Sequence, residues 1–133
     1  MAASSFLTAP EGDRTPSAID WDHLERMTLG DRRLEREVLE LFVRQTAILL
    51  ERLDGAEPGI AAAAAHTLNG SARGIGAWRV AHAAEWLERA AGEGAGDRAV
   101  DDAVAELKAA SLEVGALIGA HLTGPSNERA RAG

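Results

Sequence analysis

A histidine set among small residues is the part of this sequence that first suggests chemistry. The stretch HTLNGSARGIGAW runs from His66 to Trp78, in a chain otherwise rich in alanine, leucine and charged residues. A neutral imidazole is a nitrogen nucleophile, and much of the neutral form is present near physiological pH. Gly70 costs a helix about 1 kcal/mol relative to alanine, and it leaves the turn after His66 without a side chain. The stretch therefore predicts a histidine that another molecule can approach closely.

The direction in which His66 points follows from helical geometry. At about 100° per residue, one stripe of a helix holds Ile60, Ala64, Thr67, Leu68, Ser71 and Ile75. His66 lies about 140° from the centre of that stripe. Asn69, Gly70 and Arg73 follow it at the spacings that share a helix face. We therefore expect His66 to face solvent among polar and basic neighbours, although spacing alone also fits an ordinary surface histidine.

Composition limits the classes of function. The chain has 133 residues, no cysteine and a formal net charge of -7. This length suggests one domain, and an acidic chain is a poor partner for nucleic acid. The N-terminus lacks the basic start and apolar run of a signal peptide, and the apolar runs are too short to span a bilayer. We expect a cytoplasmic monomer that binds neither nucleic acid nor membrane.

The pattern of apolar residues, caps and breakers predicts an all-α protein without strands. Asp20 and Asp31 are predicted N-caps, and Gly74 is predicted to end the third helix in the left-handed conformation. The expected fold is an antiparallel four-helix bundle with an additional short N-terminal helix. The predicted helices cover 19–29, 31–54, 58–74, 75–91 and 97–121. Residues 18–123 form the predicted domain, between a disordered segment (1–17) and a flexible tail (124–133).

Apolar spacing also predicts the buried faces of the helices. Trp86 is expected in the core or at its edge, while the position of Trp78 is left open. The predicted buried positions are Leu34, Val38, Leu41, Phe42, Ile48, Leu49 and Leu53 in the second helix; Val80, Ala84, Leu87 and Ala91 in the fourth; and Val100, Val104, Leu107, Ser111, Val114 and Ile118 in the last.

The stretch around His66 resembles the core motif of histidine-containing phosphotransfer (HPt) domains, which reads roughly H-x-L-K-G-S-[SA]-x-x-x-G-[AL]. The downstream stretch VAHAAEWLE, residues 80–88, resembles the next helix of that family. The specific likeness covers residues 65–88, and the helix layout agrees over about 19–122. The residues that match the core motif are His66, Leu68, Gly70, Ser71, Ala72, Gly76 and Ala77.

The resemblance implies that His66 accepts a phosphoryl group from a phospho-aspartate and passes it to another aspartate. Glu88 would accept a hydrogen bond from one ring N–H and orient the imidazole. The implied partners are receiver domains of response regulators and hybrid histidine kinases, docked around His66 with Leu24 or Met27 contributing. The chain would need no cofactor of its own, because the receiver supplies Mg²⁺. It would be a phosphocarrier and not a self-sufficient enzyme.

One position departs from the family pattern. The usual lysine three residues after the histidine is Asn69 here, which can form hydrogen bonds but carries no charge. Arg73 is the candidate to supply the missing charge, since guanidinium binds phosphate well; it also fits an ordinary solvated arginine. The departure keeps open an alternative function, a receiver-binding adaptor or sequestering module that carries no phosphate. A di-iron bundle is disfavoured, because His82 and Glu85 give only one reversed H-x-x-E pair.

Overall fold

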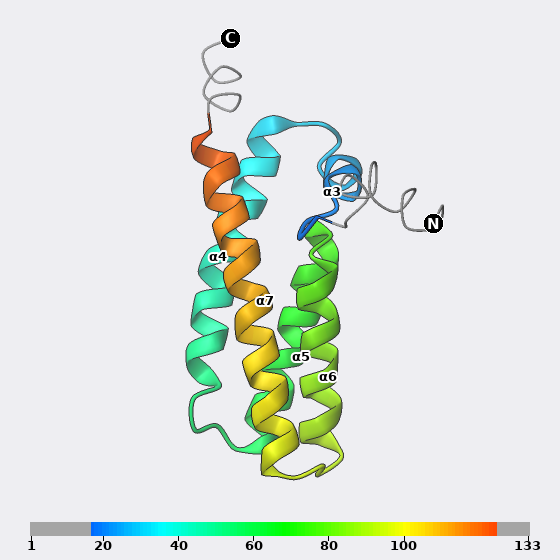
Figure 1. Cartoon of the computed structure of the whole chain (residues 1–133). Coiled ribbons are helices and arrows are strands. Elements are labelled where there is room, and N and C mark those ends of the chain that lie inside the picture. Colours follow the sequence, from blue (N-terminus) through cyan, green and yellow to red (C-terminus); the bar gives the residue numbers. More distant parts are fainter. Residues whose placement is uncertain (1–16, 125–133) are drawn as a thin grey trace, which may run out of the picture.

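The four long helices form an antiparallel bundle, with the short α3 lying across one end (Figure 1). The computed structural model describes residues 17–124, and this part is helical without strands, as predicted. Neighbouring pairs around the bundle are α4 with α5, α5 with α6, α6 with α7, and α7 with α4. The helices are α3 (Trp21–Met27), α4 (Arg32–Arg52), α5 (Pro58–Ile75), α6 (Trp78–Gly92) and α7 (Asp97–Thr123).

Residues 1–16 and 125–133 lie outside the described part of the chain, so the predicted disorder of the two ends stays a prediction. Within residues 17–124, no helix is long and apolar enough to cross a membrane. The cytoplasmic location expected from the sequence likewise stays a prediction.

Both predicted N-caps are confirmed. The Asp20 carboxylate accepts a hydrogen bond from the His23 backbone N–H at 3.1 Å. Asp31 accepts from the backbone N–H groups of Arg33 and Leu34, at 2.9 and 3.1 Å. Each cap satisfies N–H groups that have no partner inside the helix, and is worth about 1 kcal/mol.

The predicted position of the left-handed residue that ends the third helix is wrong by two residues, and the helix itself ends one residue later than predicted. Gly74 remains helical, and Gly76 is the left-handed residue, with a φ of +79°. A Cβ atom at Gly76 would lie 2.9 Å from the backbone oxygen of Asp20. Only glycine allows both this backbone conformation and the close passage of the segment that leads into α3. The following helix consequently begins at Trp78 and not at residue 75.

Small side chains bring α5 and α6 close together. The predicted buried positions of α6 are all buried, while Val100 and Val104 of α7 are partly buried and its other predicted positions fully so. Because alanine extends little beyond the backbone, helices that meet through alanines can approach more closely than helices that meet through leucines. The alanines buried on these two helices are Ala61, Ala64, Ala65 and Ala72 of α5 and Ala81, Ala83, Ala84, Ala90 and Ala91 of α6.

The buried face of α4 differs from the prediction. Leu34, Leu41 and Ile48 are exposed, and Leu39 and Thr46 take core positions instead. Apolar residues cover more than half of the circumference of α4, so spacing alone did not fix which stripe meets the core. The buried face of α5 differs from the prediction in the same way: it is centred on Ala61, Ala65, Leu68 and Ala72, while Ile60 and Thr67 are exposed.

The short helix α3 is attached to the turn between α5 and α6. Trp78 donates its indole N–H to the Asp20 carboxylate at 3.0 Å, and the Asp20 backbone N–H donates to the Gly76 carbonyl at 2.9 Å. The hydrogen bond from Trp78 is the main cause that lowers the pKa of Asp20 below its ordinary value. The His23 ring lies 5.0 Å from that of Trp78, and its Nε2 donates to the Arg73 carbonyl. Trp78 is therefore a partly buried contact of α3.

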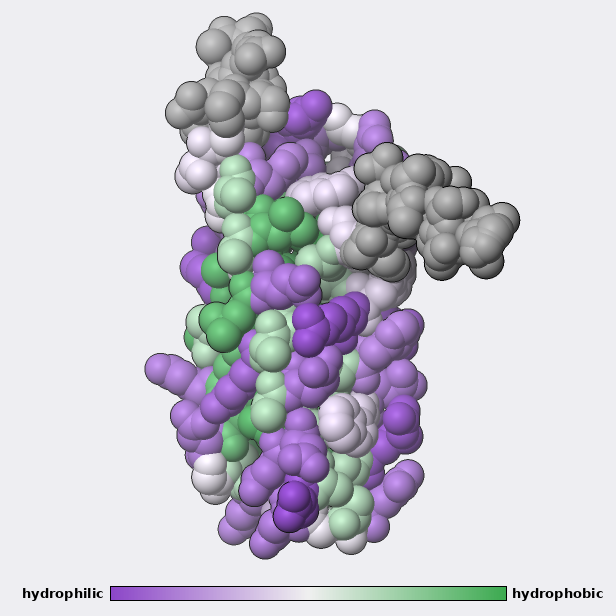
Figure 2. All heavy atoms as spheres, in the orientation of Figure 1, coloured by the Kyte–Doolittle hydropathy of each residue, from purple (hydrophilic) through white to green (hydrophobic). Residues whose placement is uncertain are grey.

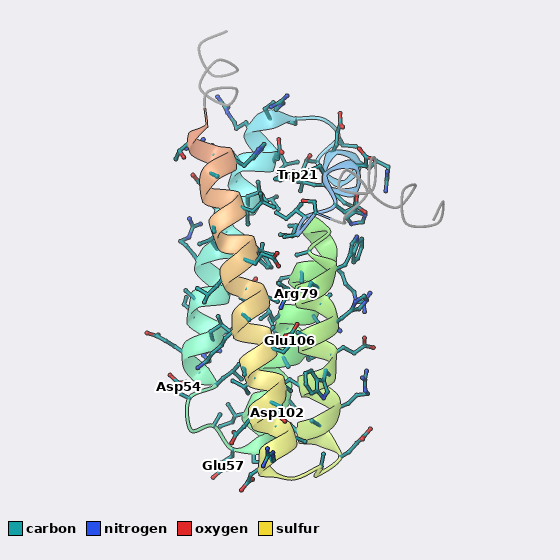
Figure 3. The ribbon with its side chains drawn as sticks, viewed as in Figure 1. Trp21, Asp54, Glu57, Arg79, Asp102 and Glu106 are labelled. Carbon is teal, nitrogen blue, oxygen red and sulfur yellow. The ribbon has the colours of Figure 1, made fainter. Side chains whose placement is uncertain are left out.

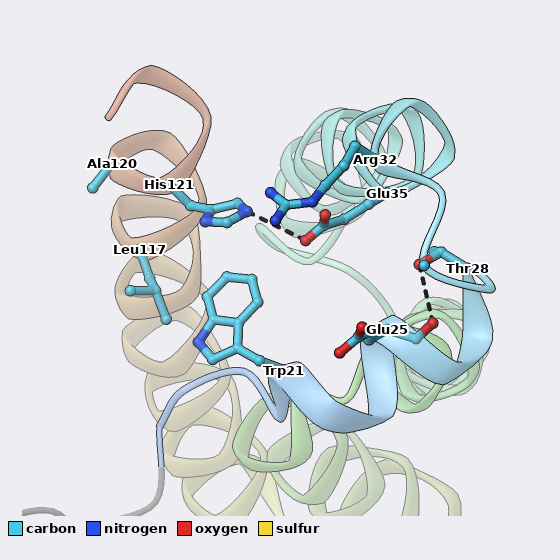
Figure 4. Close-up of a pocket in the computed structure, with 9 residues that line it drawn as sticks. Trp21, Glu25, Thr28, Arg32, Glu35, Leu117, Ala120 and His121 are labelled. Carbon is cyan, nitrogen blue, oxygen red and sulfur yellow. Dashed lines mark hydrogen bonds and ion pairs between the residues drawn. The ribbon is translucent and has the colours of Figure 1, made fainter. Parts of the chain in front are cut away.

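An ion-pair cluster joins α6 to α7, and a hollow lies at the end of the bundle covered by α3. Arg79 of α6 donates to Glu106 of α7 at 3.0 Å (Figure 3). It also donates to Glu113 of α7 at 2.8 Å, and these carboxylates raise the pKa of Arg79. At the end of the bundle covered by α3, His121 lies 3.2 Å from Glu35 and stacks against Trp21. These residues line a hollow of about 550 Å³ between α3, α4 and α7 (Figure 4).

Candidate functional site

The two residues at the centre of the prediction lie in contact. His66 on α5 has a side chain that is 76% exposed, and its Nδ1 lies 2.9 Å from Glu88 Oε2 on α6. His66 follows the buried Ala65, and Glu88 follows the buried Leu87, so each sits where its helix turns from the core to solvent. The close packing of α5 on α6 brings the two side chains within hydrogen-bond distance across the seam.

The contact determines which ring nitrogen is free. A carboxylate only accepts hydrogen bonds, so His66 Nδ1 must carry the proton that is shared with Glu88. In the neutral ring the other nitrogen, Nε2, then holds an available lone pair. Because Glu88 lies on the Nδ1 side, Nε2 is the nitrogen from which a reaction with an incoming group can start.

A second group of polar side chains lies one turn further along α5. Arg73 Nε donates to Asn69 Oδ1 at 2.8 Å, and Arg73 Nη2 lies 3.5 Å from Glu85 of α6. Since α-helical side chains tilt toward the N-terminus of their helix, the guanidinium extends back toward the turn that carries His66. Asn69 thus uses its oxygen to hold a cation where the family pattern has a lysine. The structure does not bring Arg73 itself into contact with His66.

Gly70 leaves the surface beside His66 open. A Cβ atom at this position would meet no other atom within 4 Å. No packing constraint therefore requires glycine here, in contrast to Gly76. The space that Gly70 leaves is on the solvent side of α5, where a partner molecule would approach the imidazole.

The neighbouring Ser71 fixes α5 against α4. Its hydroxyl donates to Gln45 Oε1 at 2.7 Å. Ser71 is the serine of the HPt-like motif, and in this structure it links helices and does not face His66. Ser71 therefore helps to hold α5, the helix that carries His66, in place against α4.

Sequence reasoning missed Glu85 as a member of this group. It lies three residues before Glu88, so the two carboxylates share the face of α6 that meets α5. Glu85 also lies 3.7 Å from Arg89 of α6. Its carboxylate therefore lies between two guanidinium groups, those of Arg73 and Arg89. The helical spacing to Glu88 was the signal that could have identified it.

The remaining residues considered from the sequence differ in exposure. Leu24 is buried and cannot contribute to an exposed docking surface, whereas Met27 is exposed. Trp86 is 37% exposed and is not among the residues packed against the core, so its predicted place in the core or at its edge is wrong. Within residues 17–124, no group of three His, Asp or Glu side chains is arranged to hold a metal ion.

Comparison with known proteins agrees with the motif. A family model described as the Hpt domain matches residues 37–119, more than half of the chain. The chain therefore belongs to the Hpt domain family. Proteins of this family act in histidine phosphotransfer within phosphorelays, as phosphocarriers that interact with receiver domains. Comparison with curated proteins and with solved structures returned no match.

Proposed function

We propose that this chain carries a phosphoryl group on Nε2 of His66, taken from the aspartate of one receiver domain and delivered to that of another. The observation that carries the proposal is the 2.9 Å contact between His66 Nδ1 and Glu88, on an imidazole otherwise open to solvent. It combines an accessible nucleophile with a fixed orientation, which is what a group-transfer site requires.

The chemistry balances without a further acid or base in this chain. The lone pair of His66 Nε2 forms the N–P bond, while the P–O bond of the acyl phosphate breaks and the aspartate leaves as a carboxylate. The proton on Nδ1 stays in place, so the phosphorylated ring is cationic. The Glu88 carboxylate, at 2.9 Å, stabilises that charge as it forms. Delivery to the next aspartate is the reverse reaction.

Arg73 supports this proposal by supplying charge. Its side chain is 45% exposed. Its Nε donates to Asn69, and its Nη2 lies 3.5 Å from Glu85. Both ion-pair partners are near half exposed, so the pair is weak enough to rearrange when a doubly charged phosphoryl group arrives. We propose that the guanidinium then turns from Glu85 toward the phosphoryl oxygens, in place of the usual lysine. Mg²⁺, in this proposal, comes with the receiver domain.

The central test is phosphoryl transfer from hybrid histidine kinases of the same genome. Wild-type protein should gain acid-labile, base-stable phosphate, and His66→Ala should gain none. His82→Ala is the matched control, because His82 is also an exposed histidine but lies on α6 outside the site. Glu88→Gln should transfer more slowly, since an amide can still accept from Nδ1 but does not neutralise a cationic ring.

The result that would contradict the proposal is equally clear. If receivers bind the protein but no donor labels it, the carrier function is wrong and the chain is a receiver-binding adaptor. For Arg73, the test is a rescue: Arg73→Ala should slow transfer about tenfold or more, and adding Asn69→Lys should restore it. A double variant as slow as Arg73→Ala would mean that the cation at this turn has no part in the transfer.

A further inference from the structure

One face of the bundle lies opposite the His66 site and has an apolar character of its own. The order of the helices around the bundle places the α4–α7 pair across from the α5–α6 pair. We call the outer surface of α4 and α7 the α4/α7 face. Figure 2 shows hydrophobic side chains gathered along the seam between these two helices. The function proposed for His66 makes no use of this surface.

The α4/α7 face contains a groove of about 410 Å³. Its floor and sides come from both helices, and small residues on α7 keep it open, since a Cβ at Gly115 would meet nothing within 4 Å. Two hydroxyl groups at this seam, Thr46 Oγ1 and Ser111 Oγ, are buried without a hydrogen-bond partner. The lining residues are Phe42, Val43, Thr46, Ala47, Leu50, Ser111, Leu112, Gly115 and Ala116.

A large apolar side chain stands on the edge of this groove. Leu112 is 74% exposed, although it lies in the middle of a 27-residue helix. A hydrophobic knob beside a hydrophobic hole on the same face is the arrangement that a twofold interface needs, because each copy then offers both parts. A different protein that bound in the groove would not explain why Leu112 is exposed beside it.

The charges along α4 support the same symmetry. Arg36 pairs with Glu40 along α4, and Lys108 pairs with Asp54, so these four charges are already compensated. Arg44 and Glu51, in contrast, form no ion pair within the described residues.

Arg44 and Glu51 are seven residues apart, two turns of one helix face and about 10.5 Å. If α4 packs antiparallel against a second α4, with the twofold axis near Ala47, Arg44 of each copy faces Glu51 of the other. Ala47 and Leu112 line the same groove, so Leu112 lies close to the proposed twofold axis.

We infer that two copies of this chain form an antiparallel, twofold-symmetric dimer through the α4/α7 face. Two neighbouring helices of this length present roughly 30 by 20 Å, or about 600 Å² on each copy. The total of about 1,200 Å² lies at the lower limit for specific interfaces, so we expect a weak, concentration-dependent dimer. It differs from the monomer expected from the sequence, and the experiment below decides between the two.

The test is sedimentation equilibrium of the full chain from 1 µM to 1 mM. Wild-type protein should pass from monomer to dimer, and Leu112→Asp should weaken association at least tenfold, because two copies of the charge enter the interface. Ile60→Asp is the matched control: it also replaces an exposed aliphatic residue, but on α5, and should not change the dissociation constant. Both positions are exposed, so circular dichroism should show unchanged helix content.

A charge exchange tests the proposed register. Arg44→Glu should weaken the dimer because two glutamates then face each other, and adding Glu51→Arg should restore it. A protein that stays monomeric at 1 mM would overturn the inference and leave the groove to a different partner. A dimer unaffected by Leu112→Asp, or a double variant no stronger than Arg44→Glu alone, would overturn it too.

Discussion

Replacing Gly70 by alanine should make the protein more stable and less active. The position is inside α5, and an added Cβ would contact nothing within 4 Å, so no clash offsets the gain in helix propensity. Alanine is favoured over glycine in a helix interior by about 1 kcal/mol. For a domain of this size, that raises the melting temperature by about 3–5 °C.

The loss of activity has a separate physical cause. The new methyl group would stand about 5–6 Å from the His66 Cβ, on the next turn of the same face. A transfer reaction needs its two reacting atoms about 3–3.5 Å apart and aligned, and a displacement near 1 Å can cost about 100-fold in rate. We therefore expect Gly70→Ala to accept phosphate at least tenfold more slowly than wild type.

The assay combines thermal unfolding with the rate of labelling by a phosphorylated receiver at saturating concentration. Gly74→Ala is the control, because Gly74 is also helical and unobstructed but lies two turns beyond His66. It should gain similar stability and keep its transfer rate. Gly70→Ala labelled at the wild-type rate would refute the argument that glycine keeps the site accessible, and an unchanged melting temperature would refute the stability argument.

Three further predictions concern stability, each measured by chemical or thermal unfolding. Gly76→Ala should lower the free energy of unfolding by about 3 kcal/mol, since the left-handed backbone costs about 1–2 kcal/mol and the Cβ would lie 2.9 Å from Asp20 O; a loss under 1 kcal/mol would contradict this. Thr46→Val should raise it by about 1 kcal/mol, because a buried hydroxyl without a partner is replaced by a methyl group; a loss of stability would show that the hydroxyl is paired. The lowered pKa of Asp20 adds stability above its ordinary value of 3.8 that disappears as the pH falls through the folded-state pKa. Asp20→Asn, which keeps a good N-cap, should therefore lose less stability than wild type between neutral pH and acid, and equal loss would contradict the assignment.

Much of the fold could be predicted because local signals agree with it. Asp20 and Asp31 cap helices through contacts with their own neighbours in sequence, so residue type and position were enough. The buried faces of α6 and α7 followed from apolar residues confined to one stripe. On α4 the apolar residues are spread more widely, and the choice between Leu39 and Leu41 depends on where α5 and α7 pack, which no local pattern contains.

The same distinction applies to the site. The exposure of His66 followed from the geometry of its own helix. The contact of Glu88 with His66 came only from the family resemblance, because it joins residues 22 apart on two helices. Glu85 was missed because its partner, Arg73, also lies on another helix, and α3 could not be placed on Gly76 because that contact joins segments more than 50 residues apart.

The single open side of His66 has a kinetic consequence. If His66 carries the phosphoryl group as proposed, Glu88 occupies the Nδ1 side of the ring, so donor and acceptor receivers would both have to approach Nε2 and could not occupy the site together. Transfer through such a site follows a ping-pong scheme, in which the donor leaves before the acceptor binds. A donor that has already given up its phosphoryl group then competes with the acceptor. The relative abundance of the two receivers, and not only their affinities, would then set how fast the signal passes on.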